Sequence, residues 1–183
     1  MKKRLTIPVL AMILTMVLLL TAVCPADQRN EATATARMSL RIEGGPLSID
    51  ATDMDFGTID LNRGNNQAVA RNEITVTDPT GTKAGWNVSA SASDLVSENG
   101  HRLSPEEYQL VIENLTAHSS RGGELQNPGR IQLSNEEQKI CYATPNNGLG
   151  HNTINPTYRI SVPENAPTGN YTGTISYTLV QGP

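Results

Sequence analysis

The side chains that most often carry catalysis or bind metals are sparse in this chain of 183 residues. Its three histidines, His101, His118 and His151, lack the His-x-x-x-His spacing of a zinc site, and no Cys-x-x-Cys pair accompanies them. The chain also lacks a Gly-x-Ser-x-Gly nucleophile motif and a glycine-rich loop for nucleotide phosphates. We therefore expect a protein that is not an enzyme, with no catalytic residues, no metal site and no cofactor.

A row of acidic residues in the first half of the chain comes nearest to a cation site. Asp50, Asp53, Asp55 and Asp60 offer oxygen ligands of the kind that calcium prefers. They do not form the regular Asp-x-Asp-x-Asp-Gly loop that ends on a glutamate. We favour solvated faces and turn ends as their role, with weak calcium binding as the lesser alternative.

Two short segments each combine an aromatic side chain with an aliphatic one two positions later. Trp86 is followed by Val88, and Tyr177 is followed by Leu179. Residues two apart in a strand share a face, so each pair presents a joint apolar surface. Two interpretations stay open. In the favoured one the pairs fill the core, where a large aromatic buries ~150–250 Å²; in the other they form an exposed ledge that stacks on sugar rings.

The elements that position these residues are predicted to be strands. From residue 38 on, short segments alternate apolar and polar side chains at period 2, separated by Gly, Asn, Pro and Asp. The helical signal is limited to one capped turn at residues 104–107. The pattern predicts an all-β protein, a single β-sandwich of the Ig-like or Greek-key type. The predicted strands cover residues 38–42, 47–49, 54–61, 73–77, 85–92, 108–114, 131–133, 139–143, 157–162 and 170–180.

The N-terminus has the composition of a secretory signal. Three cations at positions 2–4 precede an uncharged apolar stretch over residues 5–23. Residues 1–26 are therefore predicted to be a signal peptide, with cleavage after Ala26 and cleavage after Ala22 as a second option. Residues 27–37 are predicted to be a flexible polar leader, and residues 38–183 the β domain.

Two other roles for this N-terminus stay open. The apolar stretch is nearly long enough to span a bilayer, so an uncleaved signal would act as a membrane anchor. Alternatively, Cys24 is lipidated, although the bulky Val23 before it disfavours this. If cleavage follows Ala26, Cys141 is the one cysteine left, and we expect it to be a packed thiol within a strand.

The charge of the predicted mature chain limits its partners. Beyond residue 26 there are 11 basic and 18 acidic side chains, a net charge of −7. Sequence-independent binding to nucleic acid depends on a basic surface, so we expect no nucleic-acid partner. A hydrophobic content of 37% with 17% charged residues is typical of neither a disordered chain nor a multispan membrane protein.

The two aromatic pairs lie within longer patterns. Residues 76–86 (VTDPTGTKAGW) lead into the first pair, with Asp78, Gly81 and Gly85 at spaced positions. Gly169 and Tyr171 stand before the second pair in the same way. These segments resemble the V-x-D-x-x-G-T-x-x-G-W lead-in and the closing G-x-Y-x-x-T-x-x-W-x-L of the WxL domain of Gram-positive cell-surface proteins. The resemblance covers roughly residues 40–183.

The sequence departs from this family in both of its name-giving motifs. Val88 stands where the first motif has Leu, and Tyr177 stands where the second has Trp. The resemblance implies a secreted cell-surface protein held non-covalently to peptidoglycan or another wall glycan, often beside other surface proteins. It also implies that Trp86, Val88, Tyr177 and Leu179 serve binding. The smaller Val and Tyr keep the aromatic–aliphatic surface but reduce its area.

Another class of function stays open. The polar leader at residues 27–37, followed by the alternating segment 38–42, has the pattern of a strand donated to a neighbour's sheet edge. The protein would then be a self-assembling structural subunit of a fimbria or matrix. A surface subunit that is bound by a partner and does not contact the wall is the remaining alternative.

Overall fold

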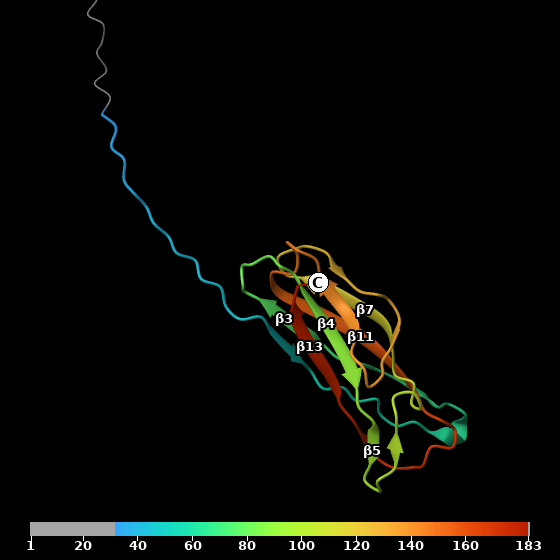
Figure 1. Ribbon diagram of the computed structural model, residues 1–183. Helices are drawn as coiled ribbons and strands as arrows, with labels where there is room; N and C mark the ends of the chain where they lie inside the picture. Colours follow the sequence, from blue (N-terminus) through green and yellow to red (C-terminus); the bar gives the residue numbers. More distant parts are fainter. Residues whose placement is uncertain (1–31, 183) are drawn as a thin grey trace, which may run out of the picture. The chain divides into compact units, whose positions relative to one another are not determined.

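The structure is a computed structural model that describes residues 32–182 (Figure 1). The predicted signal peptide and the first part of the predicted leader lie outside the described residues. The chain divides into two units, Met1–Leu40 and Arg41–Pro183. Within the first unit, residues 32–40 carry no helix or strand. Within residues 32–182, no helix is long and apolar enough to cross a membrane.

The second unit is built from strands, so the predicted all-β class is confirmed. No α-helix occurs in the described residues, and one 3-10 turn, η1, covers Leu61–Arg63. The strands are β1 (Ser48–Ala51), β2 (Gln67–Arg71), β3 (Ile74–Asp78), β4 (Trp86–Ala92), β5 (Leu95–Ser97), β6 (Arg102–Leu103), β7 (Val111–Ser119), β8 (Leu125–Gln126), β9 (Ile131–Gln132), β10 (Gln138–Ala143), β11 (Gly150–Ser161), β12 (Tyr171–Thr172) and β13 (Ile175–Gln181).

Two antiparallel sheets form the sandwich. The first sheet has the order β1-β3-β11-β7-β9, and β2 pairs with the second half of β11. The second sheet has the order β13-β4-β10-β8, and a small third sheet joins β12, β5 and β6. Ile74 and Ile154 of the first sheet and Trp86 and Val88 of the second are fully buried in one hydrophobic cluster. The predicted β-sandwich is therefore confirmed.

Strand β4 shows why the alternating pattern predicts a sandwich. Trp86, Val88, Ala90 and Ala92 are buried, and the residues between them are only half-buried. Side chains alternate faces along a strand, so β4 turns its apolar row to the core and its Asn and Ser residues outward. The register between β4 and β13 keeps the apolar residues of both strands on the core side, and a shift by one residue would turn those of β13 outward.

Two predicted strands are wrong. Residues 38–42 and 54–61 alternate in polarity, but the structure forms no strand in either segment. In the second segment the aspartates hold local turns, since Asp55 Oδ1 accepts from Gly57 N at 2.8 Å and Asp60 Oδ1 from Asn62 N at 3.1 Å. These contacts agree with the favoured turn interpretation of the acidic row. The apolar residues of segment 54–61 still pack against the core. The alternating pattern therefore indicated which residues are buried, although the segment pairs with no strand.

Other strand boundaries differ from the predicted ones for local reasons. The predicted turn at residues 104–107 is confirmed, because Ser104 N donates to Glu107 Oε2 at 2.7 Å and Tyr108 N donates to Ser104 O at 3.0 Å. This turn delays the following strand to Val111. The predicted strand at residues 170–180 is split after β12, where a Cβ on Gly173 would approach Leu95 Cδ2 to 2.9 Å.

The remaining cysteine behaves as predicted, and its chemistry can be tested. Cys141 lies fully buried in β10, and burial raises the pKa of its thiol to about 12 against a weaker opposing effect of a hydrogen bond with the Tyr142 backbone. The thiol therefore stays protonated at pH ~8, and the thiolate is the form that reacts. We expect iodoacetamide to leave Cys141 unmodified in the folded protein and to label it fully in guanidinium chloride, as measured by mass spectrometry. Equal labelling rates in both conditions would contradict this.

Candidate functional site

Trp86 is the most deeply anchored of the predicted site residues. Its side chain is fully buried, and its indole Nε1 donates to the carbonyl of Gly148 at 2.9 Å. Gly148 has a φ of 74°, and a Cβ there would lie 2.5 Å from Trp86 Nε1 and 2.5 Å from Ala143 Cβ. The indole therefore occupies space that only a glycine at position 148 leaves free.

A buried asparagine completes this contact. Asn152 on β11 is fully buried, and its Nδ2 donates to the same Gly148 carbonyl at 2.7 Å. Nδ2 also lies 3.3 Å from Val76 O and 3.2 Å from Gly150 O. The side chain thus ties the loop that receives Trp86 to strands β3 and β11. Sequence reasoning did not connect Gly148 or Asn152 with Trp86, because both lie far from it along the chain.

The lead-in to Trp86 is a turn with its own hydrogen bonds. Asp78 is buried, and its Oδ1 accepts from Thr80 N at 3.0 Å and from Thr80 Oγ1 at 2.6 Å. Gly81 and Gly85 have φ values of 69° and 78°, which favour glycine. A Cβ on Gly85 would also collide with the carbonyl of Ala143. These motif residues therefore shape the connection from β3 in the first sheet to β4 in the second.

Tyr177 is half-buried, and its hydroxyl forms hydrogen bonds with buried side chains. Its hydroxyl lies 2.7 Å from the hydroxyl of the buried Tyr158 and accepts from Asn72 Nδ2 at 3.0 Å. Burial raises the pKa of both phenols, so both are neutral at physiological pH. The tyrosine that replaces tryptophan in the second motif therefore has hydrogen-bond partners suited to its hydroxyl.

The two remaining motif residues belong to a different part of the fold. Tyr171 pairs with Ser97 in the third sheet, and its hydroxyl donates to Pro167 O at 2.8 Å. A Cβ on Gly169 would lie 3.4 Å from Ser97 Cβ. Gly169 and Tyr171 thus lie at the third sheet, just before the chain enters β13, whereas Trp86 lies in β4 of the second sheet.

The structure brings the two aromatic–aliphatic pairs together on neighbouring strands (Figure 1). Leu179 of β13 lies opposite Val88 of β4, and Tyr177 lies opposite Ala90. Trp86 and Val88 are fully buried, and Tyr177 and Leu179 are half-buried against the same core. Their positions match the core-filling interpretation. Their part in wall binding stays a prediction.

The other side of these strands is mostly polar. Asn87 and Thr178, the middle residues of the two motifs, point away from the core because side chains alternate along a strand. Cross-strand partners extend this surface over β10. We call it the outer face of the second sheet. It consists of Asn87, Ser89, Ser91, Lys139, Tyr142, Ser176, Thr178 and the exposed apolar Val180.

Several side chains of this outer face are held in place. Tyr142 donates from its hydroxyl to Gln126 Oε1 at 2.6 Å, and Lys139 Nζ lies 5.4 Å from the Tyr142 ring centroid. Thr178 Oγ1 donates to Glu137 Oε1 at 2.6 Å. A positioned ring beside hydroxyl and amide groups suits a sugar, whose faces stack and whose hydroxyl groups donate and accept hydrogen bonds.

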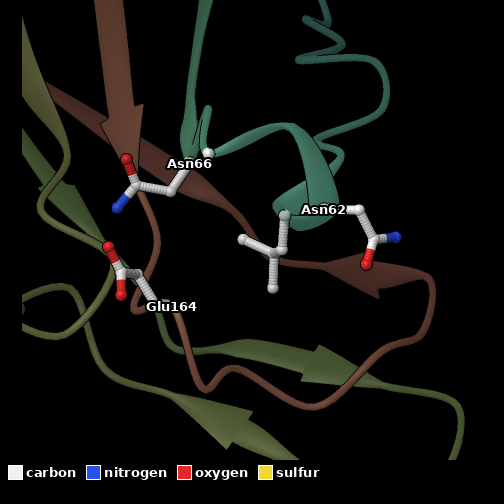
Figure 2. Close-up of a pocket in the computed structure, with 5 residues that line it drawn as sticks. Asn62, Asn66 and Glu164 are labelled. Carbon is white, nitrogen blue, oxygen red and sulfur yellow. The ribbon is translucent and has the colours of Figure 1, made fainter.

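A separate hollow lies beside η1 and has a volume of about 350 Å³ (Figure 2). It is lined by Leu61, Asn62, Gly64, Asn66 and Glu164. Asn66 is partly committed, since its Nδ2 donates to Val162 O at 2.7 Å. None of these five residues carries an aromatic ring, so the hollow lacks the stacking surface that the outer face of the second sheet has.

Comparison with solved structures gives a weak likeness. The chain is similar to a family 123 glycoside hydrolase from Clostridium perfringens, studied for the hydrolysis of glycolipid glycans. The two are 18% identical with a TM-score of 0.39, and the match covers 74% of this chain and 25% of that one. This likeness supports no statement about activity. No curated protein matches the chain.

Comparison with protein families is decisive. The family described as "WxL domain surface cell wall-binding" matches residues 23–183, which is nearly the whole chain. The match includes both motif strands and the turn that leads into Trp86. The protein therefore belongs to the WxL domain family of cell-surface, cell-wall-binding proteins.

Proposed function

We propose that this protein is secreted and attaches non-covalently to the peptidoglycan of the cell wall through the outer face of its second sheet. Family membership gives it a cell-surface location and a role in binding cell-wall components. The signal-like residues 1–26 support secretion. We also propose that it is not an enzyme, with other surface proteins as further partners.

One observation carries the choice of surface. The two motif strands lie side by side and bury their aromatic and aliphatic residues, so what they offer outward is the row between those residues. That row joins Tyr142 and Lys139 of β10 across the sheet. The predicted mature chain carries a net charge of −7, so general attraction to anionic wall polymers is a poor source of affinity. Stacking on sugar rings and hydrogen bonds to sugar hydroxyl groups are a better source of affinity.

The proposal predicts which substitutions weaken wall binding. Tyr142→Ala combined with Asn87→Ala removes the ring and an amide of the outer face, and we expect roughly tenfold weaker binding or more, equivalent to ~1.4 kcal/mol. The measurement is sedimentation of the secreted protein with purified Gram-positive peptidoglycan. Both side chains point away from the core, and each substitution removes one hydrogen bond, Asn87 Nδ2 to Gly182 O at 2.8 Å and the Tyr142 hydroxyl to Gln126 Oε1 at 2.6 Å, so the circular dichroism spectrum should keep its β shape.

A matched control uses the first sheet. Thr116 is exposed on β7, and Thr116→Ala should leave sedimentation unchanged. If the double variant and the wild type bind walls equally, the outer face of the second sheet is not the binding surface. If the wild-type protein stays in the supernatant with peptidoglycan but sediments with untreated walls, the ligand is another wall component. Trp86→Ala would lose binding only together with the fold.

A further inference from the structure

The segment at residues 38–42 has an apolar row with no partner strand. Met38, Leu40 and Ile42 are 93%, 86% and 85% exposed, and residues 38–42 pair with no strand in the described chain. They recur at every second position, so an extended backbone would place all three on one face. Exposing three large apolar side chains in a row is costly in water, and pairing with a sheet edge would bury them.

The chain that follows this segment is firmly attached to the domain. Gly45 N donates to Pro79 O at 3.1 Å, and a Cβ on Gly44 would collide with the carbonyl of Thr80. The backbone at positions 44 and 45 therefore fits closely against the turn that leads into β4. Residues 38–42 are tethered at one end by this contact.

Strand β13 is the edge that suits such a segment. It spans seven residues, whereas the other outer strands of the two main sheets in the described chain are shorter: β2 with five, β1 with four, and β8 and β9 with two each. Strand β2 is long enough for five residues, but it ends on Arg71 and turns only Ala68 and Ala70 inward. Arg71 would repel the arginine at position 41.

The free edge of β13 lacks the features that usually block strand addition. Its sequence, ISYTLVQ, contains no charge and no proline, and its register with β4 runs without a bulge. Gly182 N donates to Gly85 O at 2.9 Å and Thr174 N to Ser93 Oγ at 2.9 Å, so the even-numbered amides face β4. The amides of Tyr177 and Leu179 therefore point to the free edge.

The side chains of the two segments also match. β13 turns Ile175, Tyr177 and Leu179 toward the core, and all three are only half-buried. With Leu40 opposite Tyr177, Met38 and Ile42 lie opposite Ile175 and Leu179 in either strand direction. Charge does not oppose this pairing, since β1, which contacts β13, carries Asp50, and Arg41 of the donated segment is already paired with Glu43 at 2.7 Å.

We propose that residues 38–42 of one copy of this chain pair with the free edge of β13 in a second copy. Each copy holds one donor segment and one acceptor edge, so the contact joins copies into dimers or longer assemblies. This interaction is separate from the proposed wall binding, because it uses the edge of the second sheet and not its outer face.

The first test is sedimentation velocity of the secreted protein over a roughly hundredfold range of concentration. We expect concentration-dependent association, weakened at least about tenfold by Leu40→Asp. Ser39→Asp is the matched control, because it adds the same charge to the same segment on the face that points away from the core. Position 40 is exposed, so neither variant should affect folding. A monomer at every concentration, or equal weakening by both variants, would overturn the proposal.

The second test identifies the acceptor edge. A Ser39→Cys chain is mixed with a Ser176→Cys or Thr178→Cys chain, since paired residues lie ~4.5–5.5 Å apart between Cα atoms, within disulfide range. We expect mixed disulfides between positions 39 and 176 or 178, detected by mass spectrometry. Thr116→Cys on the first sheet is the control acceptor, and equal cross-linking to position 116 would rule out β13.

Discussion

Trp86→Ala is expected to lower the free energy of unfolding by ~3–5 kcal/mol, the cost of deleting a large aromatic from a packed core. The indole is fully buried and its N–H bonds to Gly148 O, so truncation also leaves that carbonyl with one donor fewer. Domains of this size have ~5–15 kcal/mol of stability in total, so much of it would be lost. Urea denaturation followed by circular dichroism measures the change.

The control for this prediction is Tyr142→Ala, which removes an aromatic ring from the outer face of the same sheet and should cost far less. Trp86 is the single tryptophan, so wild-type fluorescence reports on this site alone. We expect a blue-shifted emission that acrylamide quenches poorly. A solvent-like emission together with unchanged stability of Trp86→Ala would show that the indole lies on the surface.

Gly148→Ala is expected to cost ~2–5 kcal/mol, the sum of a left-handed backbone penalty of ~1–2 kcal/mol and an overpacking term of ~1–3 kcal/mol. The added Cβ would lie 2.5 Å from Trp86 Nε1 and 2.5 Å from Ala143 Cβ, and both neighbours are fully buried. The indole must then move, and its hydrogen bond to the carbonyl of residue 148 lengthens. Thermal and urea unfolding of the variant measure the loss.

Gly122→Ala separates the two contributions. Its φ of 75° is close to the 74° of Gly148, but a Cβ there meets nothing within 4 Å. It should therefore show the backbone penalty alone. Equal losses in the two variants would mean that the pocket around Trp86 relaxes to accept a methyl group, and that the glycine is needed only for its conformation.

The sequence was informative where burial and strand pairing act together. In β4, four apolar residues alternate with three polar ones, and the structure places them on opposite faces as the pattern predicts. Residues 38–42 alternate just as regularly and form no strand, and in residues 54–61 the aspartates hold local turns in place of a ladder. The alternation of apolar and polar residues alone does not specify whether a segment pairs with another strand.

The candidate site was only partly predictable for a related reason. The turn before Trp86 was visible, because its aspartate and glycines are local signals. Its partners Gly148 and Asn152 come from a loop and a strand far along the chain, and nothing near them in sequence pairs them with an indole. The outer face of the second sheet was missed because the sequence does not show that Asn87 and Thr178 lie on one surface with residues of β10. That becomes visible only when β4, β10 and β13 are aligned.

The irregularity in β10 has a consequence for how this protein tolerates insertions and deletions. The register with β4 shifts between Lys139 and Cys141, and both Ile140 and Cys141 are fully buried. Residues three apart in a regular strand face opposite ways, so this one additional residue brings Lys139 and Tyr142 to the same side. Deleting Ile140 would remove this additional residue and leave a regular strand, in which Lys139, Cys141 and Tyr142 keep their present sides and the main cost is the lost burial of the Ile140 side chain. Deleting one residue from β4, which alternates without a bulge, would instead exchange its buried and outward positions, so the two neighbouring strands should differ sharply in how they tolerate a single deletion.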